Sequence, residues 1–83
     1  MPWETPLTKP IKLKSGRVLT TLADARDLIL GTLTERAQAR PYWEYAARLL
    51  LGAGADGASE EDVEAAWAQV RRALLNDGML PVG

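Results

Sequence analysis

KPIKLKSGRVLTTLADA, residues 9–25, contains the features that decide the fold: two short alternating segments around a Ser-Gly pair, followed by a helix start. Lys9 to Leu13 alternates basic and apolar side chains, which is typical of a strand with one solvated face. Ser15-Gly16 supplies a turn, because glycine adopts positive φ without steric cost, and residues 17–20 form the partner strand. The stretch predicts a β-hairpin over about residues 9–20.

Two registers are compatible with this hairpin. A two-residue turn brings Val18 and Thr20 to the face that carries the apolar residues of the first strand. A three-residue loop with a glycine bulge brings Arg17 and Leu19 there instead. We favour the two-residue turn, because it leaves one apolar face and one basic face.

A helix follows the hairpin directly. Thr21 and Asp24 have the spacing of a capping box, with Asp in place of the usual Glu or Gln, so a helix should begin at about Leu22. Apolar residues at spacings of three and four continue this helix to about residue 33. The polar segment 34–40 either frays or continues the helix until a proline breaks it.

Two more helices complete the expected elements. Pro41 suits the first turn of a helix over about residues 41–52, which a glycine-rich segment ends. Ser59 and Asp62 repeat the capping pattern and begin a helix over about residues 60–77. The sequence therefore predicts an α+β fold, a two-stranded antiparallel hairpin packed on three α-helices, as a single domain of residues 1–83.

The composition excludes several kinds of chemistry. The chain has 83 residues, no Cys and no His, so it can form no disulfide, thiolate nucleophile, zinc finger or Ser-His-Asp relay. A chain this short buries a core that barely offsets its conformational entropy, which favours oligomerisation. We expect no enzyme activity, no cofactor and no metal, and we expect a homodimer.

Charge is distributed unevenly, although the formal net charge is only −1. Residues 1–21 have four bases and one acid, a net charge of +3, and residues 59–83 have two bases and five acids, a net charge of −3. Opposed charges at the two ends favour contact between molecules and give little net attraction to a phosphate backbone.

The sequence carries no membrane or export signal. No apolar stretch approaches the ~20 residues that span a bilayer, and the N-terminal segment has neither a basic nor an apolar signal-peptide region. We therefore expect no membrane association and a cytoplasmic location.

Acidic residues cluster at the start of the third helix, where two carboxylates could form a catalytic pair or bind a cation. Their position in the first turn is already explained by the helix dipole, which favours negative charge there. The same acids argue against a helix-turn-helix, because they would face phosphate. The residues are Glu60, Glu61, Asp62 and Glu64.

A candidate interaction surface combines two groups of side chains. One is the basic strip of the hairpin, and the other is a cluster of Arg and Tyr at the start of the second helix. Arg and aromatic residues are enriched at the centres of protein interfaces, and Arg can also clamp an anion. Trp43, in the same helix, is expected to be core. The surface comprises Lys12, Lys14, Arg17, Arg40, Tyr42, Tyr45 and Arg48.

Six short segments spread along the chain carry a family resemblance. They are Pro10-Ile-Lys-Leu13, Gly16, Thr21-Leu-Ala-Asp-Ala25, Arg40-Pro41, Ala46 and Val70-Arg-Arg-Ala-Leu-Leu75. With them the chain resembles the short bacterial proteins of domain of unknown function 982 over about residues 3–80. The family's usual Trp before the proline and Cys in the second helix are replaced here by Arg40 and aliphatic residues. The resemblance implies this fold class and a bacterial cytoplasmic setting, and it assigns no catalytic residue.

Three functions remain open at this point. The first is a non-catalytic protein–protein interaction or adaptor module that acts as a homodimer, with self-pairing or a partner strand at the hairpin edge. The second is a nucleic-acid-associated regulator that uses the basic hairpin, which the near-neutral charge disfavours. The third is a protein that binds a small anionic ligand through Arg40 or Arg48.

Overall fold

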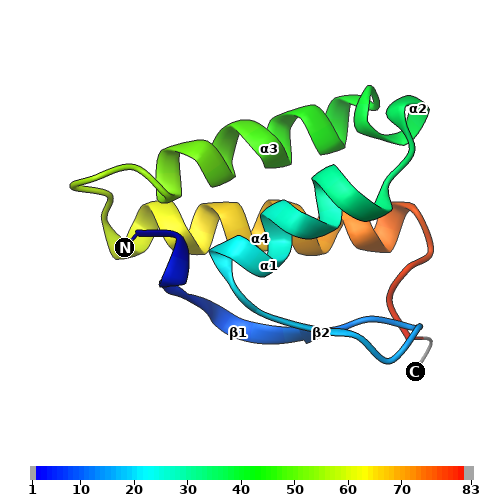
Figure 1. The fold of residues 1–83 in the computed structure, drawn as a ribbon, viewed down its shortest axis with the longest axis horizontal. Helices are drawn as coiled ribbons and strands as arrows, with labels where there is room; N and C mark the ends of the chain where they lie inside the picture. Colours follow the sequence, from blue (N-terminus) through cyan, green and yellow to red (C-terminus); the bar gives the residue numbers. More distant parts are fainter. Residues whose placement is uncertain (1, 82–83) are drawn as a thin grey trace.

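The fold is a two-stranded antiparallel sheet packed against helices, as the sequence predicts (Figure 1). The computed structural model describes residues 2–81. A short 3-10 turn, η1, precedes the hairpin. The elements in chain order are η1 (Pro2–Glu4), β1 (Pro6–Lys12), β2 (Val18–Thr21), α1 (Leu22–Asp27), η2 (Leu28–Thr32), α2 (Glu35–Gln38), α3 (Pro41–Ala53) and α4 (Glu60–Asn76).

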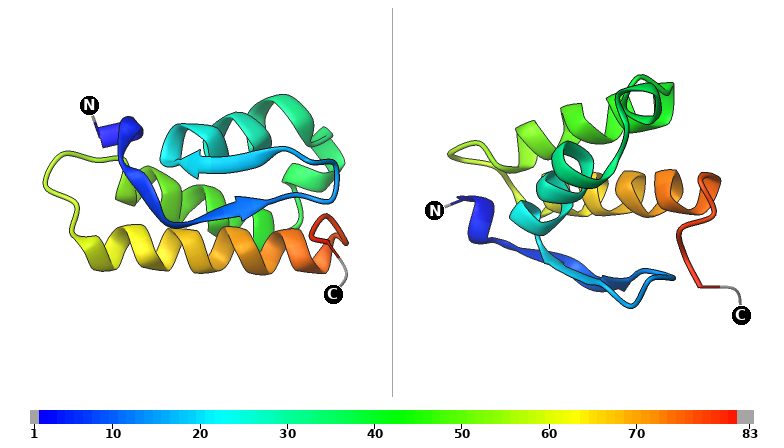
Figure 2. Two further views of the ribbon diagram at one scale, coloured as in Figure 1. Left: turned by 90° about the horizontal axis from the view of Figure 1, so that it is seen from below. Right: turned by 45° about the vertical axis from the view of Figure 1, so that its right-hand side comes forward.

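The helices α3 and α4 run antiparallel, and the sheet lies on the opposite side of the molecule from α3 (Figure 1). Seen from the sheet side, β1 lies alongside α4, and β2 lies beside α1 (Figure 2). The core fills the space between the sheet and the helices, with Trp43 at 0% exposure as its largest side chain. The other fully buried large residues are Leu19, Leu22, Leu28, Val70 and Leu74.

The register that we favoured for the hairpin is wrong. Ile11 pairs with Leu19 and Lys12 with Val18, which is the register of the three-residue loop. Leu19 is fully buried, whereas Val18 is 45% exposed on the outer face. Two causes act together: Gly16 takes a φ of +98° at the last loop position, and this register buries the larger leucine side chain.

The strand β1 begins earlier than predicted and bulges in its middle. Pro6 pairs with Thr21 and Ile11 with Leu19, so four residues of β1 lie opposite the single residue Thr20. The Thr20 backbone N–H donates instead to the Asp24 carboxylate, at 2.9 Å. The same carboxylate completes the capping box of α1, which the sequence predicted.

The helical segment after the hairpin changes its winding. The α-helix ends at Asp27, and a π-helical turn, η2, continues to Thr32, closed by a bond of 3.2 Å from Leu33 N–H to the Leu28 carbonyl. The chain is extended at Leu33, and Thr34 then caps the separate short helix α2. The segment 34–40 therefore neither frays nor continues the first helix, because the Thr34 hydroxyl starts a new helix.

The predicted positions of the last two helices are confirmed to within one residue. Pro41 occupies the first turn of α3, and Ser59 with Asp62 forms a complete capping box at the start of α4. Within the part of the chain that the structure describes, no helix is long and apolar enough to cross a membrane.

Candidate functional site

The predicted interaction surface divides between two sides of the molecule. The hairpin residues Lys12, Lys14 and Arg17 lie at the sheet, and the residues of α3 lie on the helix farthest from the sheet (Figure 1). Lys12 and Lys14 are exposed, and the Arg17 guanidinium donates to the Thr32 hydroxyl at 3.1 Å. The seven residues therefore do not form one continuous site.

Two of the candidates at the start of α3 form hydrogen bonds within the molecule. The Arg40 guanidinium lies 2.7 Å from Oδ1 of Asp77, and the Tyr42 hydroxyl donates to the same oxygen. The indole N–H of buried Trp43 donates to Oδ2 at 2.7 Å. Three donors at the start of α3 therefore hold one carboxylate at the end of α4, and only Tyr45 and Arg48 stay exposed and without a partner of this kind.

The Asp77 carboxylate is largely covered, with 8% of its side chain exposed. Burial opposes its ionisation, but the hydrogen bonds from Tyr42 and Trp43 and the charge of Arg40 outweigh burial and hold the pKa of Asp77 below its ordinary value. The bond to Asp77 in turn raises the pKa of the Tyr42 hydroxyl. This cluster is fully satisfied by its own members, which is the property of a structural clamp between helices.

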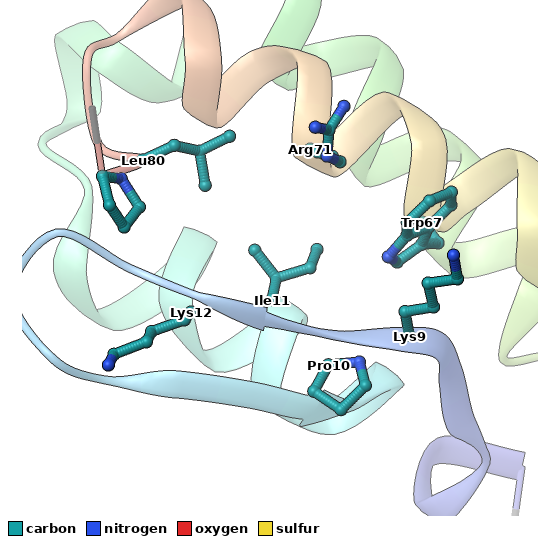
Figure 3. Close-up of a pocket in the computed structure, with 8 residues that line it drawn as sticks. Lys9, Pro10, Ile11, Lys12, Trp67, Arg71 and Leu80 are labelled. Atoms are coloured by element: carbon teal, nitrogen blue, oxygen red, sulfur yellow. The ribbon is translucent and has the colours of Figure 1, made fainter. Parts of the chain in front are cut away.

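A groove between β1 and α4 is open to solvent and has a donor in its wall that is unpaired in the described chain, whereas the Asp77 cluster is closed and fully paired. It has a volume of about 390 Å³, and the C-terminal segment closes one end. Ile11 and Leu80 point into it, while Lys12 points away from it (Figure 3). Its lining residues are Lys9, Pro10, Ile11, Lys12, Trp67, Arg71, Leu80 and Pro81.

Trp67 contributes the one buried side-chain donor of the described residues that lacks an acceptor. Its indole nitrogen is shielded from solvent and has no hydrogen-bond acceptor within residues 2–81. Figure 3 shows this nitrogen turned toward β1, with the Lys9 side chain beside the ring. A buried donor without an acceptor costs about 1–3 kcal/mol, so this wall of the groove is incomplete without an added acceptor.

A second hollow is apolar and lies between η1, η2 and α3. Its volume is about 170 Å³, and it is framed by Leu30 and Leu51, the two most exposed large apolar side chains of the described chain, at 68% and 66% exposure. Trp3 forms one wall, where the Arg26 guanidinium lies 4.8 Å from its ring centroid. The remaining lining residues are Ile29, Ala47 and Leu50.

Glycine at position 54 allows Trp3 to occupy that wall. A Cβ atom on Gly54 would lie 2.8 Å from the Trp3 ring, closer than side-chain atoms pack. The end of α3 and the N-terminal turn can therefore meet only because residue 54 has no side chain.

Lys12 is the one lining residue of the two hollows that the sequence had placed in the candidate interaction surface. Trp67 falls on the apolar stripe of its helix, so its spacing indicated core, and Leu30 and Leu51 read as ordinary helix positions. For the Asp77 cluster the sequence does contain a signal, because an acid at a helix C-terminus lies where the helix dipole disfavours negative charge. Among residues 2–81, no group of three or more acidic side chains could hold a metal ion.

Comparison of the chain with protein-family models, with curated proteins and with solved structures finds no match. The resemblance to domain of unknown function 982 therefore stays a prediction.

Proposed function

We propose that the protein is a non-catalytic protein–protein interaction or adaptor module of a bacterial cytoplasm, and that it acts as a homodimer. The observation that carries the proposal is the apolar hollow with its two exposed leucines. Leu30 and Leu51 are about two-thirds exposed and frame the same hollow, although they come from different helical segments. Neighbouring exposed leucines of this kind are typical of a contact surface.

A symmetric contact through this hollow is energetically sufficient for a weak dimer. Complete burial of a leucine contributes about 1.5–3 kcal/mol, so two leucines from each protomer, already one-third buried, contribute about 4–8 kcal/mol in total. Association costs at least about 4 kcal/mol in lost rotational and translational freedom. The surplus is at most about 4 kcal/mol, which corresponds to a Kd of about 1 mM. We therefore expect a partly dimeric protein at high micromolar concentration, and not a permanent tight assembly.

The hairpin edge is a less favourable place for self-pairing than the sequence suggested. The backbone N–H of Lys14 donates to the Met79 carbonyl at 2.8 Å, so the C-terminal segment already covers part of that edge. The apolar hollow has no comparable cover within residues 2–81. We therefore propose the hollow, and not the hairpin edge, as the dimer contact.

Sedimentation of three single variants tests the proposal. Leu30→Glu and Leu51→Glu should each abolish the dimer, because a buried carboxylate would replace a buried leucine in both protomers. Leu75→Glu is the matched control, since Leu75 is 62% exposed but belongs to α4 and not to the hollow. Circular dichroism should show all three variants folded.

Two results would contradict the proposal. The first is a strictly monomeric wild-type protein at high micromolar concentration. The second is a dimer that Leu75→Glu weakens as much as Leu51→Glu does, because this would place the contact outside the hollow.

A further inference from the structure

We infer that the groove between β1 and α4 binds an acidic, apolar segment of a partner protein through a carboxylate. The inference rests on the proposed function as an interaction module, and it names the chemistry of the partner. It uses a different surface from the dimer contact, because no residue of this groove lines the apolar hollow.

The charge of the groove selects a carboxylate. Lys9 and Arg71 lie on opposite elements at its borders, and none of its lining residues is acidic. Trp67 adds a neutral N–H donor that has no acceptor within residues 2–81. The indole nitrogen is shielded in the unbound groove, so a carboxylate accepts from it once the Lys9 side chain beside the ring moves aside (Figure 3), and the two cations then compensate the charge of the carboxylate.

The shape of the groove selects a peptide rather than a compact small molecule. Ile11 and Leu80 form an apolar floor, and the groove is open along β1 instead of closing over its contents (Figure 3). A small molecule would stay largely solvated there, whereas an extended segment can place an apolar side chain on the floor and an acidic side chain at Trp67. Alternation of side chains along an extended chain supplies both contacts.

Nuclear magnetic resonance of the ¹⁵N-labelled protein gives a direct readout. The three tryptophans give three indole signals, and Trp43 is an internal reference because its N–H already donates to Asp77. The probe is the capped peptide acetyl-Leu-Glu-Leu-Glu-Leu-amide, and its control is the same peptide with Gln in place of Glu.

The Glu peptide should move the Trp67 indole proton downfield in a saturating titration and leave that of Trp43 unchanged. The Gln peptide should bind about tenfold more weakly, because charge-assisted hydrogen bonds exceed neutral ones by about 1.4 kcal/mol or more. Arg71→Gln should weaken the Glu peptide up to about fivefold. The adjacent Arg72→Gln, which removes the same charge outside the groove, should change nothing.

Trp67→Phe supplies a second measurement that does not depend on the indole signal. It should weaken peptide binding, followed by the amide signals of Ile11 and Leu80. The free energy of unfolding should change little, since removal of the orphan donor offsets the lost packing against the core. A purely structural tryptophan would instead lose stability.

Four results would overturn the inference: no saturating shift of the Trp67 signal, equal binding of the Glu and Gln peptides, equal effects of Arg71→Gln and Arg72→Gln, or hexanoate binding as tightly as the Glu peptide. Repeating the titration on Leu51→Glu separates this inference from the dimer proposal. A monomeric Leu51→Glu protein that still binds the peptide supports the groove independently of the dimer.

Discussion

The indole N–H of Trp43 donates to the Asp77 carboxylate at 2.7 Å, across 34 residues of sequence. Trp43 is the largest side chain of the core, and Asp77 follows the last residue of α4. This one bond orients the central ring of the core and fixes the start of α3 against the end of α4. A second link has the same effect, because Gln69 donates from its side chain to the Tyr42 carbonyl at 3.1 Å.

Removal of the Asp77 carboxylate should destabilise the protein strongly. Asp77→Ala leaves the Trp43 N–H buried without an acceptor, which should lower the free energy of unfolding by about 1–3 kcal/mol. Arg40→Ala removes only a partly exposed ion pair, with Arg40 44% exposed, and should cost less than about 1 kcal/mol. Urea denaturation measures the free energy of unfolding of both variants. Equal losses would show that the ion pair with Arg40, and not the indole hydrogen bond, accounts for the effect of Asp77.

Two carboxylates, Asp77 of the clamp and Asp24 of the α1 capping box, should make the free energy of unfolding depend on pH. Backbone hydrogen bonds from Thr20 lower the pKa of Asp24, and the pKa of Asp77 is also below its ordinary value of 3.8. A lowered pKa stabilises the fold above the unfolded-state pKa, so the free energy of unfolding should be constant down to about pH 4 and fall below it. Denaturation curves from pH 2 to 7 measure this decline.

An Asn variant separates the two carboxylates. Asp77→Asn should flatten part of the decline below pH 4, since one of the two titrating groups is gone. An acid decline identical to that of the wild type would exclude Asp77 as its source.

On the alkaline side the pKa of Tyr42 is raised. The contribution of Tyr42 to the free energy of unfolding is therefore complete below pH 10 and is lost as pH rises through its folded-state pKa.

Two glycine variants should change stability in opposite directions. Gly16 has a φ of +98°, where an L side chain is strained, so Gly16→Ala should cost about 1–2 kcal/mol. Gly52 lies within α3 with open space around it, and Gly52→Ala should add about 0.5–1 kcal/mol because alanine loses less backbone entropy. Thermal denaturation compares them, and a neutral Gly16→Ala would argue against the observed loop.

Neighbouring residues of β2 test the hairpin register. Leu19→Ala should cost about 2–5 kcal/mol, because Leu19 is fully buried, and Val18→Ala should cost less than about 1 kcal/mol at 45% exposure. The two-residue turn predicts the reverse order. Chemical denaturation of the two variants distinguishes the registers.

Local signals in the sequence predicted most of the fold. The spacing of Thr21 with Asp24 and of Ser59 with Asp62 located two helix starts correctly, because a capping box involves only residues three apart. Pro41 located a third for a similarly local reason. The prediction of the register failed because alternation fits both loop lengths. The burial of Leu19 against the helices, which acts together with the loop conformation of Gly16, is not visible in a local pattern.

The candidate sites depend on contacts that no local pattern contains. Arg40 and Tyr42 looked available for a partner because their acceptor, Asp77, is 37 and 35 residues away. Trp67 looked like core because helical spacing does not show whether an indole N–H finds an acceptor. Arg71 became part of a groove only when β1 was placed along α4.

That placement has a consequence for how the chain is made. Leu7 and Ile11 are buried in β1, and α4 lies alongside this strand, so a strand made before all the α-helices of the described chain is covered by the last of them (Figure 2). During translation, residues 6–12 stay uncovered until residues 60–76 have left the ribosome. A nascent chain halted between α3 and α4 therefore displays an apolar strand, the kind of surface that chaperones bind and that aggregates.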